Sequence, residues 1–564
     1  MYNRVDITSL SDRLDAEYYT EDQIQNLTIL NSFGVFPFYK VCTSINVGYT
    51  GELTSQYTDK GTVLYRVSDI DGLFLKEDKV NYVPEYFAEE NRQIWIKNGD
   101  VVLAAVGNTI GKVAIKSFHL PDGVCSRALM ITRPIPEKID SHFLVTYLSC
   151  KFAQKSLLRG ISGSAQPVLN TPLISNLPII QVNSIAQRYI GNKVRQAEIL
   201  RPWEELLSKF SKFLVESLIQ ENINEEELIT AQNSLEMGDT KPERNLLAKL
   251  DVWNTKYSNV TDKKNRMSFS KFYSTDELID IIAAPSYSPE LVSYCKKVEK
   301  YPKLGQFMVG KAKLGITGSI AKDYVTSDTP NAVPYISTKQ VKGLFAYLDD
   351  IKYISAASDV EWEKCRINDG DIIINKSGNV GAAAILSCKP YIYINSVSDI
   401  INIRINDTQI DKAYLVEYLN SPYGQKQLQR LSGGAIFDHV SLHAIPEINI
   451  AVFDFKAQRY IGNKVRLTEN IKLTEKSLMI ASKALIEALI GGQITETQLI
   501  EAQQALEEGD DSKDRAILSK LTDKGYLAKD GTELFDDLDT LYELLDEAKD
   551  AIDSSSTAND EVIL

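Results

Sequence analysis

The chain contains few cysteines and histidines, and no two cysteines form a Cys-x-x-Cys pair. Its 564 residues include six cysteines and four histidines. The cysteines lie in apolar or strand-like surroundings, so neither a disulfide framework nor a zinc site is expected at this length. Four histidines give little support to histidine-based catalysis. A reducing, cytoplasmic compartment therefore fits this sequence best.

Long hydrophobic runs are also missing. No stretch approaches the roughly 18 to 20 apolar residues that a membrane-spanning helix needs. Met1 to Leu10 lack the apolar core of a signal peptide. Hydrophobic residues make up 44% of the chain and charged residues 24%, which is typical of a soluble globular protein. The length predicts about three or four domains.

A basic excess over the whole chain is absent, because the formal net charge is −14. Acidic residues gather in residues 530–564, which hold twelve Asp and Glu against one Lys. Residues 97–212, in contrast, hold fifteen Lys and Arg against seven Asp and Glu. A locally basic region is what a phosphate-contacting surface requires. A solvated basic face without a nucleic-acid partner explains the same count equally well.

The sequence does contain one module written twice, at an offset of 271 residues. The nine residues from Gln187 to Arg195 recur without change as Gln458 to Arg466, and residues 227–239 return in similar form as 498–510. The segments 40–98 and 304–369 match only at scattered Gly and apolar positions. This pattern indicates a duplicated domain pair with a common scaffold and two different variable surfaces.

Both copies have the same predicted order of elements. Strand-like runs divided by Gly and Asp turns come first, at 62–67, 100–106 and 113–115, and again at 334–336, 371–374 and 382–385. An amphipathic helix follows, from about Phe143 to Leu157 or from Tyr414 to Leu428. A long helix closes each module, at about 185–219 and 461–490, and Pro202 is expected to interrupt or kink the first.

The long helices carry an apolar seam with three- and four-residue steps, which is typical of helices packed on helices. A helix lying on its own domain is the simpler alternative, but the length of both seams favours two related helices packing together. The acidic tail shows a leucine pattern that fits either a docking helix or a disordered, solubilising segment. The seam residues are Ile190, Val194, Ala197, Trp203, Leu207, Phe210 and Leu214, and then Ile461, Val465, Leu478, Leu485 and Leu489.

Three motifs that suggest chemistry do not survive comparison between the copies. The segment from Val106 to Lys112 has one residue too few between its glycines for a P-loop, and the second copy lacks the lysine. The pair His439 and His443 has metal-like spacing but no counterpart in the first copy. The run from Asp369 to Lys376 lacks the second acid of a nuclease site, so a turn acid is the better interpretation. The chain is expected to be non-catalytic.

Taken together, these motifs resemble the specificity subunit of type I restriction–modification enzymes. The resemblance rests on the aromatic start from Leu14 to Tyr19, the Gly-Asp-strand-Gly units at 99–111 and 370–381, the segment from Ser162 to Pro167, and the long helix with its Gln-Arg start. It covers nearly all of residues 1–490. The second copy lacks the acidic-aromatic start and differs at 433–438, so its domain is expected to contact DNA differently.

The resemblance implies an α+β fold with two target recognition domains, each followed by a long helix, and an antiparallel coiled coil formed by the two helices. The implied segments are a first recognition domain (1–183), a first helical region (184–250), a second recognition domain (251–454), a second helical region (455–525) and an acidic tail (526–564). Each half would read one part of a bipartite DNA target for methyltransferase subunits and a restriction/translocase subunit. No cofactor is expected on this chain, since S-adenosylmethionine and ATP would belong to those partners.

Asn, Gln, Arg and Lys side chains read base edges, whereas Lys, Ser and backbone amides hold phosphates. The DNA-binding candidates are Asn108, Thr109, Lys112, Arg127 and Gln166 in copy one, and Lys339, Gln340, Lys376, Ser377 and Asn379 in copy two. The partner-binding candidates are Lys193, Arg195, Trp203, Phe210, Lys464 and Arg466. A two-domain protein–protein scaffold is the main alternative function, and an enzyme with an unfamiliar site is another.

Overall fold

The computed structural model describes residues 16–77, 80–159, 161, 168–257, 284–320, 322–432 and 439–560, and the chain divides into two compact units. The first unit comprises Met1–Glu204 and Ile471–Leu564, and the second comprises Glu205–Asn470. Two long helices, α6 (Ser184–Ile219) and α13 (Phe455–Ile490), contribute to both units. Each unit therefore contains segments from both copies of the repeat.

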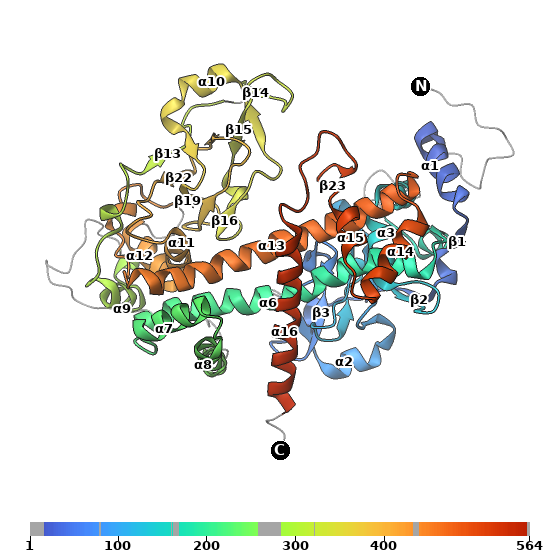
Figure 1. Cartoon of the computed structure of the whole chain (residues 1–564), viewed down its shortest axis with the longest axis horizontal. Coiled ribbons are helices and arrows are strands. Elements are labelled where there is room, and N and C mark those ends of the chain that lie inside the picture. Colours follow the sequence, from blue (N-terminus) through green and yellow to red (C-terminus); the bar gives the residue numbers. More distant parts are fainter. Residues whose placement is uncertain are drawn as a thin grey trace. The chain divides into compact units, whose positions relative to one another are not determined.

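Two β-sheets with a shared apolar core form the centre of the first unit (Figure 1). Val63 and Val124 of one sheet and Val102 and Ile131 of the other lie in that core. The first sheet has the order β6 (Asn81–Val83), β3 (Thr62–Tyr65), β10 (Gly123–Cys125) and β7 (Trp95–Ile96). The second has the order β2 (Cys42–Val47), β11 (Leu129–Pro134), β8 (Val101–Ala104), β9 (Val113–Ile115), β5 (Phe74–Leu75) and β4 (Ile70–Asp71).

The second unit repeats both sheets in the same strand order. One sheet runs β14 (Tyr324–Val325), β17 (Lys352–Ile354), β15 (Val333–Ile336), β21 (Tyr393–Ser396) and β18 (Ile367–Asn368). The other runs β13 (Lys313–Leu314), β22 (Ile400–Ile403), β19 (Ile372–Asn375), β20 (Ala383–Leu386) and β16 (Phe345–Ala346). Within these two pairs of sheets, the edge strands β4 and β14 lack a counterpart among the described strands. The repeat thus continues through segments whose sequences barely match, and the predicted strands are confirmed.

A buried turn acid precedes the central strand in each copy. Asp100 accepts hydrogen bonds from Arg133 Nε (2.9 Å) and Nη2 (2.7 Å), and from the Lys97 N–H (2.8 Å). Asp371 accepts the same set from Arg404 (2.8 and 2.9 Å) and the Asn368 N–H (3.0 Å). All acceptor positions of a buried carboxylate need such partners. The turn interpretation of this acid, against a nuclease site, is therefore confirmed.

The single amphipathic helix predicted after the sheets is wrong in both copies, because it is divided in two. In copy one α3 (Ser141–Ser149) is followed by α4 (Lys151–Arg159), and in copy two α11 (Lys412–Asn420) is followed by α12 (Pro422–Ser432). Cys150 and Ser421, which separate the pairs, have extended backbone while their N–H groups cap the preceding turn. The apolar periodicity continues across the break, so it did not indicate the boundary.

The aromatic start of copy one packs on α4. Within the described residues it forms a short 3-10 helix, Ala16–Tyr19, before α1 (Glu21–Ser32). Arg159 donates to the Tyr18 carbonyl (2.7 Å), and its guanidinium lies 3.6 Å from the Tyr18 ring centroid. Asn26 of α1 donates to Ser156 Oγ (3.1 Å). A weaker contact of Arg430 with Tyr287, at 5.9 Å, repeats this arrangement in copy two.

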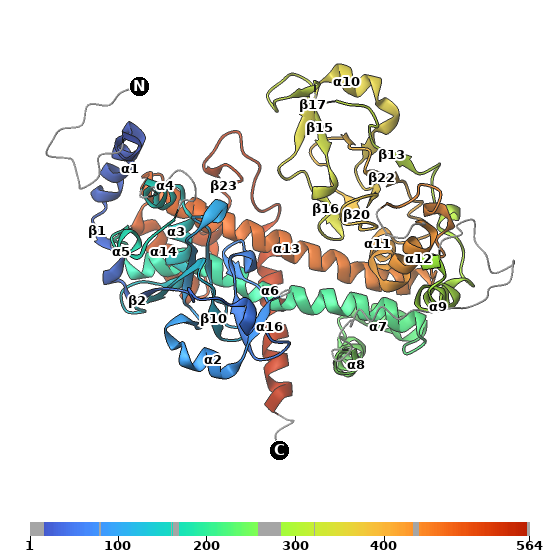
Figure 2. The same cartoon turned by 180° about the vertical axis from the view of Figure 1, so that it is seen from behind.

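The α6 and α13 helices lie side by side and run antiparallel, as predicted (Figures 1 and 2). All the predicted seam residues are buried. Near the middle of the helices, Arg201 pairs with Glu475 and Lys472 pairs with Glu204 (3.0 Å), and the repeat offset relates these two pairs. Burial raises the pKa of Glu475 to about 7, although the Arg201 charge opposes this.

Pro202 does not interrupt α6, so the predicted break is wrong. A proline inside a helix removes one hydrogen bond and costs about 3 kcal/mol. Here the neighbouring Leu200, Trp203 and Leu207 are buried along the seam. Each such side chain contributes about 1.5–3 kcal/mol when it is buried, which offsets that cost.

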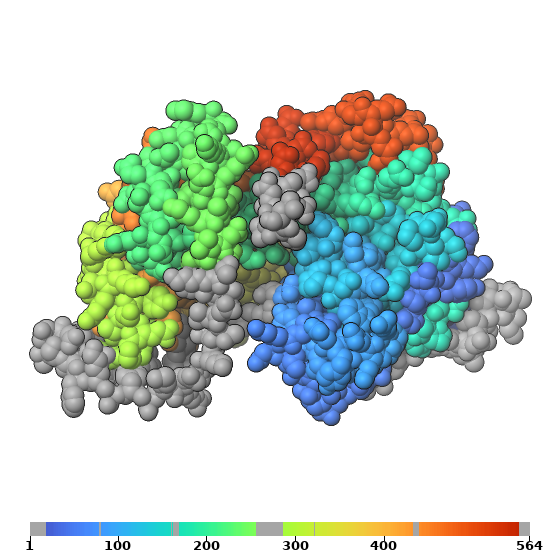
Figure 3. Space-filling view, turned by 90° about the horizontal axis from the view of Figure 1, so that it is seen from below, coloured from blue at the N-terminus to red at the C-terminus, as the bar shows by residue number. Residues whose placement is uncertain are grey.

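The shorter helices are exchanged between the copies. Helices α14 (Glu496–Glu507) and α15 (Ser512–Leu518) of copy two belong to the first unit, whereas α7 (Glu225–Glu236) and α8 (Lys241–Tyr257) of copy one belong to the second. In Figure 3 the orange and red C-terminal atoms adjoin the teal atoms of the first unit. The five consecutive domains predicted from the sequence stay a prediction. Because they follow one another along the chain, they do not describe this exchange of helices between the copies.

The C-terminal segment of the first unit contains a small hairpin, β23 (Leu521–Thr522) with β24 (Gly525–Tyr526), and then α16 (Leu538–Asp560). Leu541, Leu544, Leu545 and Ala548 are buried. Of the two interpretations of the acidic tail, the docking helix is confirmed for the residues whose side chains are described, up to Ala551. None of the described helices is long and apolar enough to cross a membrane.

Candidate nucleic-acid interface and its junction with the helices

A tight turn connects β8 and β9 in the first pair of sheets, and it carries exposed polar side chains. Gly107 and Gly111 have φ of 76° and 88°, a left-handed backbone that favours glycine. A 3-10 helix, Gly107–Thr109, occupies the turn. Asn108 and Lys112 are exposed, whereas the Thr109 hydroxyl donates to the Val106 carbonyl (3.3 Å). The glycines therefore shape a strand connection, as the rejection of the P-loop predicted.

Two further candidate segments meet this turn. Ala105, directly before it, donates to the Ala128 carbonyl (2.9 Å) and accepts from the Leu169 N–H (2.9 Å). The first contact brings in the loop that carries the exposed Arg127. The second brings in the chain that follows Gln166, and Gln166 itself lies outside the described residues. We call Asn108, Lys112 and Arg127 the first turn surface.

The second copy has an equivalent surface that keeps the asparagine of the turn but carries other cations. The Lys376 N–H donates to the Asp399 carbonyl (2.7 Å), and the Lys376 carbonyl accepts from the Val440 N–H (2.9 Å). Asn375 Nδ2 donates to the Thr338 carbonyl (3.3 Å), which brings the segment after β15 to the same turn. Lys339 and Asn379 are exposed, and Lys376 and Ser377 are half-buried. We call Lys339, Lys376, Ser377 and Asn379 the second turn surface.

Gln340 is less available for base reading than the sequence predicted. Its Oε1 accepts from the Ser337 N–H (2.9 Å) and hydroxyl (3.0 Å), and its Nε2 donates to the Asp349 carbonyl (3.0 Å). The side chain closes a capping box on the 3-10 helix Thr338–Gln340. A contact with DNA would have to break these bonds.

The basic excess of residues 97–212 is largely neutralised inside the chain. Within the described part of the chain, Lys112 and Arg127 have no ion-pair partner and keep their charge at the surface. Two of the cations for which the described residues show no ion pair thus lie on the first turn surface, which a count of charges did not reveal. Eight of the fifteen cations are in ion pairs, namely Lys116, Arg133, Lys151, Lys155, Arg188, Lys193, Arg195 and Arg201.

One face of the repeated nine-residue segment holds α3, which packs on the first pair of sheets, against α6. Gln187, Gly191 and Arg195 lie four residues apart and face Asp140, which caps α3. Gln187 Oε1 accepts from the Asp140 N–H (3.0 Å), and Arg195 pairs with the Asp140 carboxylate. A Cβ at Gly191 would lie 2.6 Å from Asp140 Oδ1. These contacts explain why the repeat keeps these residue types.

The other face of the same segment holds the helices of the second copy. Lys193 Nζ donates to both oxygens of Asp514 (2.7 and 2.8 Å), and the Tyr189 hydroxyl donates to Oδ1 (2.5 Å). Asn192 donates to Gln503 Oε1 (3.0 Å). Burial raises the pKa of Asp514, but the Lys193 charge and the donated hydrogen bonds outweigh it, so the pKa lies below its usual value.

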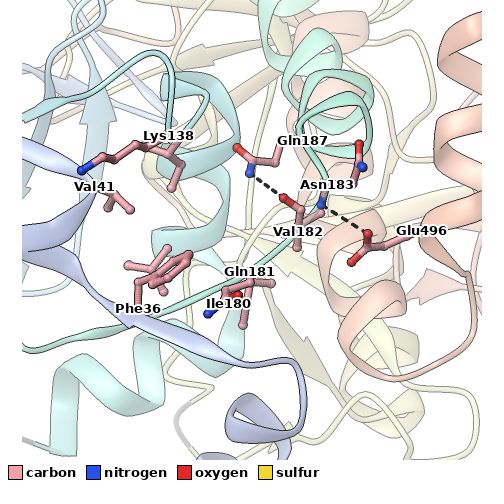
Figure 4. Close-up of a pocket in the computed structure, with 11 residues that line it drawn as sticks. Phe36, Val41, Lys138, Ile180, Gln181, Val182, Asn183, Gln187 and Glu496 are labelled. Carbon is pink, nitrogen blue, oxygen red and sulfur yellow. Dashed lines mark hydrogen bonds between the residues drawn. The ribbon is translucent and has the colours of Figure 1, made fainter.

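The second junction repeats the first at the same offset. Gln458 accepts from the Asp411 N–H (3.1 Å), Arg466 pairs with Asp411 (2.5 Å), and Lys464 pairs with Glu243 (2.6 Å). Figure 4 shows the edge of the first junction, where the Asn183 N–H donates to Glu496 (3.2 Å) beside a cavity of about 400 Å³. The Asp454 N–H donates to Glu225 (2.6 Å) in the second.

The six partner-binding candidates therefore have roles within this chain. Lys193, Arg195, Lys464 and Arg466 form the ion pairs just described, and Trp203 and Phe210 are 8% and 0% exposed. Contact of these six side chains with another subunit stays a prediction. The sequence reasoning missed Asp514 and Glu243 as the partners of Lys193 and Lys464. The available signal was that these two acids also lie 271 residues apart.

His439 and His443 are both exposed. Among the residues that the structure describes, no group of three or more His, Cys, Asp or Glu side chains has the geometry to hold a metal ion.

Comparison with known proteins points to one family. The model of the type I restriction modification DNA specificity domain matches residues 34–200. A type I restriction enzyme specificity subunit (MjaVIII) of Methanocaldococcus jannaschii is 25% identical over 175 residues, which cover 29% of this chain and 40% of that relative. A putative type I restriction enzyme specificity subunit (MjaX) of the same organism is 22% identical over 464 residues, which cover 79% of this chain and 90% of that relative.

A crystal structure of a type I restriction-modification S subunit from M. genitalium is 13% identical, with a TM-score of 0.36 and coverage of 83% of this chain and 95% of that chain. The family model covers part of the first copy, and the longer of these two sequence matches extends over both copies of the repeat. This chain is therefore similar to type I restriction–modification specificity subunits, and its residues 34–200 match their DNA specificity domain.

Proposed function

We propose that this chain is the DNA sequence-recognition subunit of a type I restriction–modification complex, and that each half reads one part of a bipartite target. One observation supports this most strongly. Two copies of the same pair of sheets present a turn surface at the same place, where both keep an asparagine (Asn108 and Asn379) but the cations differ, since Lys112 corresponds to Ala383 and Lys376 to Ala105. Identical scaffolds with different reading surfaces are what two unlike half-sites require.

The chemistry in this proposal belongs to partner subunits. Methyltransferase subunits carry out adenine methylation with S-adenosylmethionine, and a restriction/translocase subunit uses ATP. This chain recognises the DNA target sequence at which they act. The names of the curated relatives support this division, since each is called a specificity subunit of a type I restriction enzyme.

The two kinds of exposed side chain have different tasks. Lys112 and Arg127 carry free charge that attracts the phosphate backbone irrespective of sequence. Asn108 and Asn379 offer an amide that pairs with the edge of a base, adenine in particular. The glycine turns bring the backbone close to the duplex without steric hindrance.

Methylome sequencing of cells with and without this chain decides the function. A split adenine-methylation motif that disappears on deletion is the expected result. An unchanged methylome, or equal binding of random and cognate duplexes by the assembled complex, would contradict the proposal. A protein–protein scaffold would show no dependence of DNA affinity on salt, whereas a DNA reader shows a log–log slope set by the phosphates it neutralises.

We expect Lys112→Ala to weaken DNA binding by a similar factor for all sequences and to reduce the salt slope by about one. The matched control is Lys40→Ala. Lys40 is exposed but precedes β2, whose Cys42 pairs with Pro134 at the end of the sheet away from the turn. Fluorescence anisotropy at several salt concentrations measures both quantities. Equal losses for the two variants would remove Lys112 from the interface.

We expect Gln166→Ala to relax specificity instead. A lost pair of hydrogen bonds to a base reduces discrimination by about 1–3 kcal/mol, with little change for mismatched duplexes. Competition between the cognate duplex and duplexes changed at single positions measures this. A uniform loss over all duplexes would assign Gln166 to the phosphate backbone.

A further inference from the structure

The two junctions are related by the repeat, yet they are closed differently. Asp514 is fully buried and accepts from Lys193, Tyr189 and, in addition, the Tyr542 hydroxyl (2.5 Å to Oδ2). Its counterpart Glu243 accepts from Lys464 at Oε1 and interacts with the Tyr460 hydroxyl, the repeat counterpart of Tyr189, but none of the described residues takes the place of Tyr542 there. The first junction therefore has one more tether than the second.

That tether comes from α16, which lies outside the repeated pattern. The helix is docked by its buried leucines, and the β23 strand contacts the chain just before it, where the Leu534 N–H donates to the Leu521 carbonyl (3.1 Å). Arg515 pairs with Asp539 (2.6 Å) and lies 4.6 Å from the Tyr542 ring centroid. These contacts attach α16 to the α15 segment that carries Asp514.

We propose that α16 positions the first recognition domain, with Tyr542 as the positioning residue. The path has two steps. Tyr542 orients Asp514, which holds Lys193 and Tyr189 on one face of α6. The opposite face of the same turns holds Asp140, the cap of α3 in the recognition domain. The expected effect of this positioning on DNA recognition rests on the proposed function.

Burial makes this tether effective. Asp514 has no access to water, so a lost hydrogen bond is not replaced by solvent, and an acceptor left unpaired is costly. An undocked α16 would also admit water to the ion pair and weaken its electrostatic attraction. Within the described residues the second junction shows no such tether, so it provides an internal reference within the same molecule.

Hydrogen exchange in the full-length chain tests the tether. We expect Tyr542→Phe to speed amide exchange in residues 187–195 by about tenfold, since a hydrogen bond to a charged group is lost, and Leu545→Asp to speed it more. Residues 458–466 should not change in either variant. The control is Tyr86→Phe, because Tyr86 lies in the same unit on α2 (Glu85–Glu90) and is 62% exposed. Equal changes at both junctions, or no change at the first, would overturn the proposal.

Half-site discrimination in the assembled complex tests the consequence. In Tyr542→Phe we expect discrimination to fall about fivefold to tenfold for the half-site that is sensitive to Gln166→Ala, and to stay constant for the other. Uniform loss for both half-sites would reduce Tyr542 to a residue of general stability and overturn its positioning role. A wild-type complex that discriminates neither half-site would contradict the proposed function, whereas the exchange result would still decide the tether.

Discussion

Lys193→Ala is expected to lower the free energy of unfolding of the first unit by about 3–5 kcal/mol, because it leaves a buried carboxylate without its cation. Lys193 and Asp514 are 1% and 0% exposed, and the two hydrogen bonds between them are short. Tyr189 and Tyr542 still donate to Asp514 in the variant, but neither supplies charge. Urea denaturation, with exchange of the β8 amides as the probe, measures the loss.

Two further variants sharpen this result. Lys464→Ala should cost less, because that pair is 10% and 15% exposed and solvent partly replaces the cation. Replacing both Lys193 and Asp514 by apolar residues should recover much of the loss, since no buried charge then remains. A loss below about 1 kcal/mol for Lys193→Ala, the size found for surface pairs, would show that the junction is open to water.

Phe210→Ala is expected to destabilise the second unit by about 3–5 kcal/mol through the cavity it leaves. Phe210 is fully buried in the core with Leu214 and Tyr414, and its ring stacks on Phe213 at 6.2 Å between centroids. The urea midpoint of the isolated chain measures the effect. If Phe210 served partner binding alone, the isolated chain would keep its stability and only assembly would suffer.

Val252→Ala is the matched control for Phe210→Ala, since Val252 lies in α8 of the same unit and is 71% exposed. The free energy of unfolding of this control should change by less than about 0.5 kcal/mol, as for surface substitutions in general. An equal loss in both variants would mean that the second unit unfolds by a route in which this core takes no part.

Elements with a periodic or punctuated local sequence were predictable. The strands next to Asp100 and Asp371 and both long helices follow from alternation, glycine turns and apolar steps. Two features were not predictable from the local sequence: the helix break at Cys150 and the continuation of α6 through Pro202. Both depend on how the surrounding residues pack. Comparison between the copies removed the false P-loop and the histidine pair, which one copy alone would not have done.

For the candidate site, the residue types were predictable and their availability was not. Lys112 and Arg127 remain free at the surface, while Gln340 is held in its own turn. The same holds for the basic stretch, where the charges of most cations are used inside the chain. Charge counts report composition, whereas exposure depends on which acids the fold brings near.

The sequence by itself determined the duplication, its 271-residue offset and the α+β class, because these are properties of order and period along the chain. Only the tertiary structure decided what the repeated nine residues do. Lys193 meets Asp514 across 321 residues, and Lys464 meets Glu243 across 221. A lysine in a helix specifies a charge but not the distant helix that folds against it, and that choice is made by burial of the apolar faces around the pair.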